Sequence, residues 1–136
     1  MGFNNPSSVL PKKLLAQMKW GGGLPSWPIS LIPPVIEAYR VKGLINRGGD
    51  LQIIELSGVW ESPNIGVWVF DNELDGTDPQ QRVYEAARIA LAKFASLDAE
   101  ELREEAVAGC PFLQGDATQY DPAMLRFSWS AEPTSC

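Results

Sequence analysis

A strand followed by a helix, within Ile65–Leu97, is the feature that most constrains how this chain can fold. The short apolar and β-branched run Ile65–Phe70 predicts a buried strand. Asp78 then occupies an N-cap position, with Pro79 at the first helical position and Gln81 three residues after the cap. Apolar residues recur every three or four positions through the rest of the segment. We therefore expect one amphipathic helix of about five turns that lies on the sheet.

The length and composition fit one globular domain. The chain has 136 residues, of which 45% are hydrophobic, and this is enough to bury a sizeable core. It has no apolar run of the roughly 18 residues that a membrane span needs, and its first residues lack the pattern of a signal peptide. We therefore expect a soluble, intracellular protein with no membrane partner. Cys110 and Cys136 are too few for a disulfide framework, so we expect both to be reduced.

Charge is distributed unevenly along the sequence. The net charge is −6, but residues 1–47 contain six basic residues and the single acid Glu37. The other residues contain 16 acids and five bases. The acidic majority would repel nucleic acid, so we expect protein partners instead. Two interpretations stay open: the split only serves solubility, or the basic part of one copy lies on the acidic body of another chain.

The first 34 residues differ from the rest in composition. Pro11–Trp20 predicts a short helix that ends at Gly21. Closely spaced glycines and prolines follow, which disfavour a longer helix or an interior strand. The same stretch is rich in large apolar side chains, and such a segment usually lies in a groove, either its own or a partner's. We therefore predict an irregular N-terminal arm with an assembly interface at Trp20, Trp27, Ile29, Leu31 and Ile32.

Three strands are expected after the arm. Val35–Ile45 predicts the first strand, and Leu51–Trp60 predicts the second, with a hairpin turn over Asn46–Asp50 between them. Ser62–Asn64 predicts a turn into the third strand at Ile65, which gives an antiparallel meander. The long helix then crosses this meander.

A second helix and a last strand complete the pattern. Asp98 begins a capping box, so a shorter helix is expected to run to about Ala108 and to end at Gly109. Leu125–Ser130 alternates apolar and polar residues, which predicts a strand with one apolar face. The sequence thus predicts an α+β fold, an antiparallel sheet of about four strands covered by one long helix. Residues 1–34 would form the arm and residues 35–136 the α+β domain.

The acidic loop before the long helix is the best candidate for a metal site. Asp71, Glu73 and Asp75 alternate and Gly76 follows, which is how a calcium loop of the EF-hand kind begins. The twelfth position of such a loop needs a bidentate glutamate, but Arg82 stands there. The competing interpretation is that these acids favour the dipole of the following helix and keep the loop solvated.

The tryptophans and the side chains capable of catalysis are the remaining candidates for a functional site. Trp60, Trp68 and Trp129 lie in expected strands, where aromatic side chains stack on bases or, more often, fill the core. Histidine is absent, which removes the commonest general base. Cys110 has no basic neighbour in the sequence, so we expect a buried and inert thiol. The sequence therefore predicts no catalytic residue and no cofactor.

The expected order of elements resembles that of tail-terminator and related head-to-tail joining proteins of bacteriophages. The resemblance covers about residues 35–130 and includes no residue motif, so it carries no site residue with it. It implies a ring-forming structural subunit without a cofactor, located in the virion if the chain is phage-encoded. We therefore expect a non-enzymatic subunit of a phage tail, neck or baseplate, which forms a homo-oligomer or binds other subunits through its arm.

Two other classes stay open. A small acidic adaptor or inhibitor that binds one protein would have the same composition, and it would be monomeric in solution. A single-stranded nucleic-acid binder would need its tryptophans exposed beside the basic first third, and its affinity would fall with salt.

Overall fold

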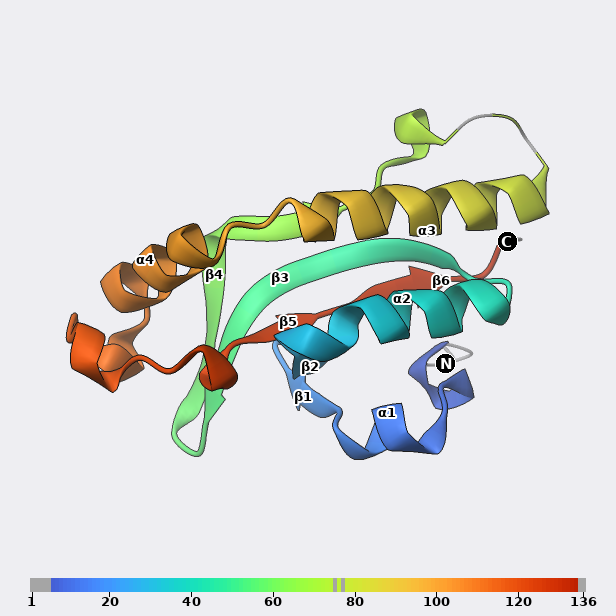
Figure 1. Ribbon diagram of the computed structural model, residues 1–136. Helices are drawn as coiled ribbons and strands as arrows, with labels where there is room; N and C mark the ends of the chain where they lie inside the picture. Colours follow the sequence, from blue (N-terminus) through green and yellow to red (C-terminus); the bar gives the residue numbers. More distant parts are fainter. Residues whose placement is uncertain (1–5, 75, 77, 135–136) are drawn as a thin grey trace.

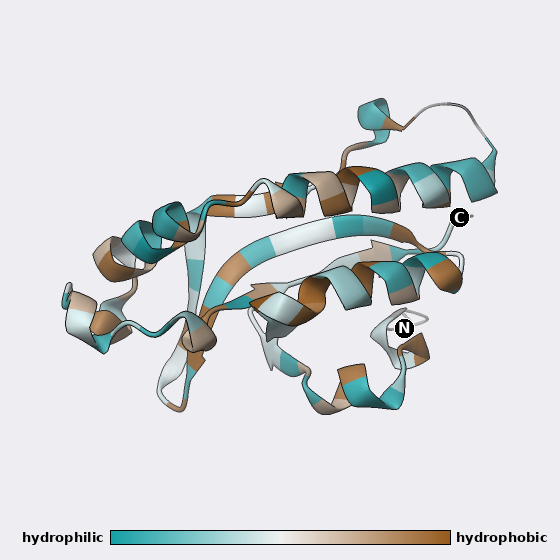
Figure 2. Ribbon diagram, viewed as in Figure 1, coloured by the Kyte–Doolittle hydropathy of each residue, from teal (hydrophilic) through white to brown (hydrophobic). Residues whose placement is uncertain are grey.

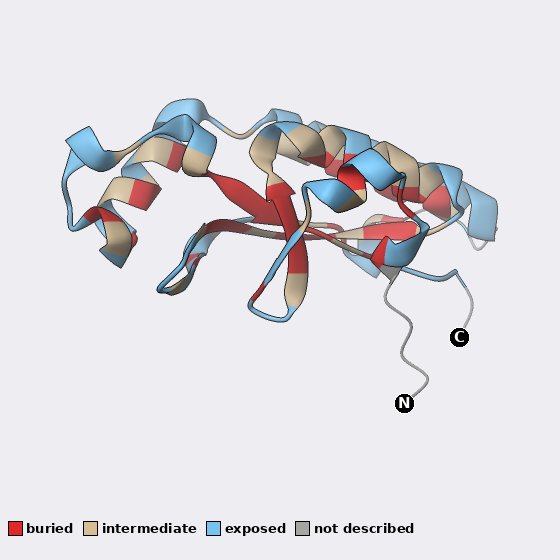
Figure 3. Cartoon of the chain, turned by 90° about the horizontal axis from the view of Figure 1, so that it is seen from below, coloured by how far each residue is buried: buried red, intermediate tan, exposed pale blue. Residues whose placement is uncertain are grey.

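The computed structural model describes residues 6–74, 76 and 78–134. In this part of the chain, four α-helices and six strands form an α+β fold with one antiparallel sheet (Figure 1). The fold class is therefore the expected one, whereas about four strands and one long helix were predicted. In Figure 3 the helices lie along one side of the strands, and two strand hairpins project away from them.

The helices and strands have the following bounds. The α-helices are α1 (Lys12–Ala16), α2 (Ile32–Val41), α3 (Pro79–Ala95) and α4 (Ala99–Gly109). The strands are β1 (Lys19–Gly21), β2 (Leu24–Pro28), β3 (Ile45–Glu55), β4 (Gly58–Trp68), β5 (Arg126–Ser128) and β6 (Ser130–Glu132). The single last strand that was expected over residues 125–130 is thus split into β5 and β6.

The sheet interleaves two β-α-β units. Its strand order is β1-β2-β5-β3-β4, and β6 pairs with the beginning of β3. Strands β2 and β3 both run antiparallel to β5, so they are parallel to each other, and α2 connects them. Strands β4 and β5 both run antiparallel to β3, and α3 and α4 connect them. Strand β5, which comes late in the chain, therefore lies between the β1–β2 hairpin and the β3–β4 hairpin.

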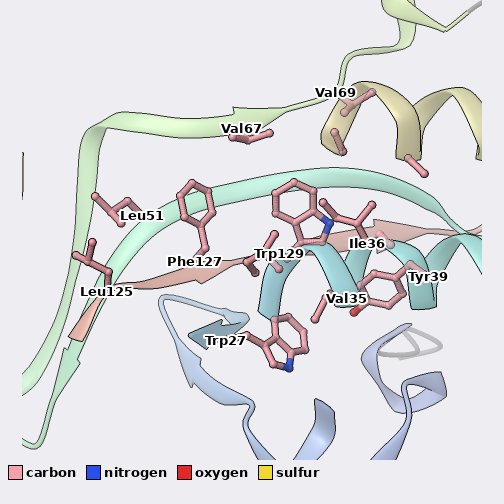
Figure 4. Packing of buried hydrophobic residues seen from close by; sticks show 14 of the residues in the cluster. Trp27, Val35, Ile36, Tyr39, Leu51, Val67, Val69, Leu125, Phe127 and Trp129 are labelled. Carbon is pink, nitrogen blue, oxygen red and sulfur yellow. The ribbon is translucent and has the colours of Figure 1, made fainter. Parts of the chain in front are cut away.

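The core lies between the sheet and the helices. Trp27, Phe127 and Leu51 are paired across β2, β5 and β3, and all three are fully buried (Figure 4). The ring of Phe94 in α3 meets the edge of Phe127, with 5.4 Å between the ring centroids. Trp129 Nε1 donates to Asn46 Oδ1 at 2.8 Å, which satisfies the indole inside the core. The helices thus cover one continuous apolar face of the sheet.

Helices α3 and α4 confirm the predicted caps. The Asp78 side chain accepts a hydrogen bond from the Gln81 backbone N–H at 3.3 Å, and α3 begins at Pro79. The expected stripe is buried where it contacts the sheet, at Val83, Ala86, Ala87 and Ala90. Asp98 caps α4 in the same manner through the Glu100 backbone N–H. Figure 2 shows α4 and the first turns of α3 coloured mostly as hydrophilic, in agreement with their exposure.

The strand predicted over Val35–Ile45 is wrong, because most of this segment is helix α2. Pro33 and Pro34 lie in its first turn, where a missing N–H costs no hydrogen bond. The buried residues of α2 are spaced by three and four, which is the helical period: Ile32, Val35, Ile36 and Tyr39. Helical spacing therefore determined the structure, although the segment is rich in β-branched residues.

The hairpin turn predicted over Asn46–Asp50 is also wrong. Strand β3 continues through Gly48 and Gly49, and the turn lies at Leu56–Ser57. Gly48 has φ +123° beside a register shift against β6, which marks a bulge. A side chain at residue 49 would lie 1.8 Å from the Ser128 carbonyl oxygen. The two glycines thus permit a bulge and a close approach of strands.

The predicted turn at Ser62–Asn64 corresponds to a large irregularity inside β4, where several residues lie opposite one residue of β3. Gln52 pairs with Glu61 and Asp50 pairs with Gly66, so residues 62–65 face Leu51 alone. The Ser62 hydroxyl accepts hydrogen bonds from the backbone N–H groups of residues 64 and 65, at 3.1 and 2.9 Å. The two strands that were predicted separately are therefore one bent strand.

The prediction of an irregular N-terminal arm is wrong, because part of this segment belongs to the sheet. Strands β1 and β2 form a hairpin, and Ser26 and Trp27 of β2 pair with β5. The boundary expected after residue 34 lies inside α2. The short helix predicted over Pro11–Trp20 is present as the five-residue α1. The apolar residues of this segment are thus largely used by the chain's own core.

We predict that Trp27→Ala lowers the free energy of unfolding by about 3–5 kcal/mol, because it removes a fully buried indole. It also removes the hydrogen bond from Trp27 Nε1 to the Leu14 carbonyl at 2.8 Å. The matched control is Trp20→Ala, whose side chain is 52% exposed and whose loss should cost about 1 kcal/mol or less. Denaturant unfolding measures both. Equal effects would show that β2 is not part of the core.

Candidate functional site

The predicted metal ligands Asp71 and Glu73 are paired with basic side chains of the chain itself. Asp71 Oδ1 lies 2.8 Å from Arg47 Nη2 and 3.0 Å from Arg82 Nη2. Glu73 Oε2 lies 2.7 Å from Lys93 Nζ. Asp75 is outside the described residues. Among the residues that are described, no group of three or more acidic or cysteine side chains is arranged to hold a metal ion.

These ion pairs shift the ionisation of both acids. The hydrogen bond and charge of Arg47, with a contribution from Arg82, lower the pKa of Asp71. The hydrogen bond from Lys93 lowers the pKa of Glu73, and the backbone N–H of Phe70 adds to this effect. Arg47 also contacts Glu132 of β6, at 2.5 Å. The loop after β4 is thus attached to β3 and α3, and Arg47 also joins it indirectly to β6, which is a structural role.

The five predicted interface residues divide into exposed and buried ones. Trp20 is half-exposed, and Ile29 and Leu31 are partly buried. Trp27 and Ile32 have no exposed surface and belong to the core. This corrects the expectation that the whole segment is available to a partner, because the sheet and α2 already cover two of its side chains.

Three apolar side chains of the β3–β4 hairpin, Ile54, Leu56 and Val59, form a surface that we call the hairpin-end surface. Strand β1 lies against β4, since a side chain at Gly21 would lie 3.0 Å from Val59 Cγ2 and 3.2 Å from Ile54 Cδ1. Val59 pairs with Ile54, and the fully exposed Leu56 lies at the turn beyond them. Large apolar side chains on a surface commonly mark a protein interaction site when they are adjacent.

A groove of about 370 Å³ lies between the end of α2 and the beginning of α3. We call it the α2–α3 groove. Val41 and Tyr84 line it and are 67% and 57% exposed. Its other lining residues are Arg40, Gly43, Pro79, Gln80, Val83 and Thr134. This groove and the hairpin-end surface account for four of the seven exposed large apolar side chains in the described part of the chain.

A buried polar cluster, which sequence reasoning missed, lies at the junction of β2 and β5. Arg126 is 8% exposed; its Nε donates to Ser26 Oγ at 3.1 Å, and its Nη2 donates to the carbonyls of Gln17 and Ser26. Burial lowers the pKa of Arg126. No carboxylate among the described residues pairs with it. The guanidinium therefore acts through directed hydrogen bonds, which connect the end of α1 to the sheet.

The strand tryptophans and Cys110, which the sequence also singled out, contribute to the packing of the fold. Trp60 and Trp129 are buried, while Trp68 is half-buried and donates from Nε1 to Asp50 Oδ1 at 3.2 Å. Cys110 is buried, and burial raises its pKa, as expected for an inert thiol. Cys136 is outside the described residues.

Leu56 of the hairpin-end surface had a sequence signal that was overlooked. Leu56 stands between Glu55 and the Ser57-Gly58 pair, which is turn chemistry, so an exposed leucine was predictable once the turn was placed there. The α2–α3 groove had no such signal, because α2 was expected to be a strand.

No family model, curated protein or solved structure matches this chain. No helix in the described part of the chain is both long and apolar enough to cross a membrane.

We predict that Asp71→Asn removes an acid-dependent part of the stability. The pKa of Asp71 is lowered from 3.8 in the folded state, so its contribution is present above about pH 4 and is lost as pH falls through the folded-state pKa. The melting temperatures of the natural protein and the variant should therefore differ most near neutral pH and converge below about pH 4. Glu104→Gln is the control, since no ion pair of Glu104 is seen among the described residues. A difference that is independent of pH would contradict the ion-pair role.

Proposed function

We propose that this protein is a non-enzymatic subunit of a larger protein assembly and that it associates with other copies of itself. The observation that carries this proposal is the hairpin-end surface, where the large apolar side chains of Leu56 and Val59 are exposed at the end of the β3–β4 hairpin. Burying each of these side chains would contribute roughly 1.5–3 kcal/mol. The fold gains nothing from leaving them in water, so a contact outside the chain accounts for them best.

The setting that we propose is a phage tail, neck or baseplate. It is supported by the resemblance to tail-terminator and head-to-tail joining proteins, which rests on the order of elements. In the structure this order begins with helix α2 in place of a first strand, followed by the β3–β4 hairpin, α3, α4 and β5. The structure therefore keeps only part of the order on which the resemblance rests, and the virion setting has less support than self-assembly.

A second candidate is an acidic adaptor that binds one basic protein. Helix α4 favours it, because Glu100, Glu101 and Glu104 are exposed on it. Arg103 is the single basic residue of this helix and is paired with Glu100. Such an adaptor would be monomeric, which separates it from the first candidate. A nucleic-acid binder is favoured less, since Lys19 is the one basic neighbour of the exposed Trp20 in the sequence.

Sedimentation velocity over a wide range of protein concentration tests the proposal. The natural chain should sediment as an integer multiple of its own mass, and Leu56→Ser/Val59→Ser should shift this equilibrium toward the monomer by at least about tenfold in concentration. Phe70→Ser is the matched control, because Phe70 is 59% exposed and lies outside the hairpin-end surface. A natural chain that stays monomeric at every concentration would overturn self-assembly and support the adaptor.

A further inference from the structure

The hairpin-end surface and the α2–α3 groove lie at opposite ends of the molecule. Strand β3 begins three residues after Lys42, where α2 ends, and it runs for 11 residues to Glu55 at the hairpin turn. At about 3.3 Å per residue, a strand of this length spans roughly 30 Å even when it is bent. Figure 1 shows the turn between β3 and β4 at one end of the molecule and the end of α2 near the other. A copy of the chain therefore cannot place its own turn in its own groove.

The turn between β3 and β4 is short, and it exposes an apolar and an acidic side chain. It consists of Glu55, Leu56 and Ser57, all of which are exposed. Leu56 is fully exposed, so its side chain makes no contribution to the core. The turn thus presents one apolar side chain next to one negative charge.

The α2–α3 groove offers the complementary surface. Val41 and Tyr84 provide exposed apolar walls, and its volume of about 370 Å³ suits one or two side chains. Lys42 lies between the lining residues Val41 and Gly43, is exposed, and has no ion pair among the described residues. Arg40 also lines the groove, although Glu37 already pairs with it. Lys42 therefore supplies an unpaired positive charge at the α2 side of the groove, while the Asp78 carboxylate at the α3 side serves as the N-cap of α3.

We propose that copies of this chain associate head to tail, with the Glu55–Ser57 turn of one copy seated in the α2–α3 groove of the next. Leu56 enters between Val41 and Tyr84, and Glu55 approaches Lys42. This inference rests on the proposed self-assembly and specifies the contact that forms it. The two surfaces match in charge and in apolar character, and the length of β3 prevents the contact from closing within one copy.

A contact of this kind is heterologous, because each copy uses two different surfaces. Repeating it builds either a closed ring or an open filament, according to the rotation between neighbours. It differs from a two-fold dimer, in which the same surface of both copies meets. Because the two surfaces differ, a variant of one surface can still bind a variant of the other, and a general loss of association would not give this result.

The test uses one variant of each surface. Leu56→Asp disables the turn and Tyr84→Glu disables the groove, and both replaced side chains are exposed, so the fold should be retained. Each variant alone should be monomeric at concentrations where the natural chain associates, with affinity reduced by at least about tenfold. An equimolar mixture should form dimers and nothing larger, since one intact turn meets one intact groove.

Charge reversal gives an independent measurement on the same contact. Glu55→Lys and Lys42→Glu should each weaken association, and a chain that carries both changes should regain most of it, because the opposite charges then face each other again. Phe70→Ser is the control and should keep the mass of the natural protein. Circular dichroism and melting temperature show whether each variant is folded.

Each of the other outcomes overturns a different part of the proposal. If the natural chain associates and both Leu56→Asp and Tyr84→Glu keep its mass, the turn-in-groove contact is overturned while self-assembly stands. If both variants are folded monomers and their mixture forms no dimer, the head-to-tail geometry is overturned. If the natural chain is monomeric at every concentration, self-assembly itself fails and the contact fails with it.

Discussion

The structure depends on β5, a strand of three residues that pairs with β2 on one side and β3 on the other. Through Phe127 it aligns Trp27 and Leu51 in one buried row, which is the centre of the core. Ser26 and Ser128 are paired although about 100 residues separate them along the chain. Among the described residues, the N-terminal hairpin therefore joins the rest of the sheet through β5 alone, and β5 carries the pairing from β3 to β2.

This long-range pairing explains which parts of the fold could be predicted from the sequence. Helices α3 and α4 were predicted because Asp78 and Asp98 carry their signals within a few residues of the helix. Strands β1 and β2 were missed because their partner β5 is distant, and local composition favoured an irregular arm. Segment 35–45 was misassigned because its β-branched residues also fit a helical spacing, and the two prolines of the first turn begin a helix as readily as they exclude a strand.

Less of the candidate site than of the fold could be predicted from the sequence, and the reason is related. Exposure is a property of the assembled sheet, and it separates Trp20 from Trp27 although both lie in the same proline- and glycine-rich segment. Trp20 lies in the edge strand β1, while Trp27 lies in β2, which has a neighbour on both sides. The acids of the loop before α3 had the spacing of metal ligands. Their partners, Arg47 and Lys93, come from elements that the sequence could not place beside them.

The charge split of the sequence is partly neutralised within one copy. Arg47, from the basic first third, pairs with Asp71 and Glu132 of the acidic remainder, and Arg40 pairs with Glu37. The bases of the first third that have no ion pair among the described residues are Lys12, Lys13, Lys19 and Lys42. Lys42 is distinguished from the others because it borders the α2–α3 groove, whereas the other three precede β2. Opposed charge along the sequence is therefore weak evidence for contact between chains by itself, and it gains weight where an unpaired base borders an exposed apolar groove.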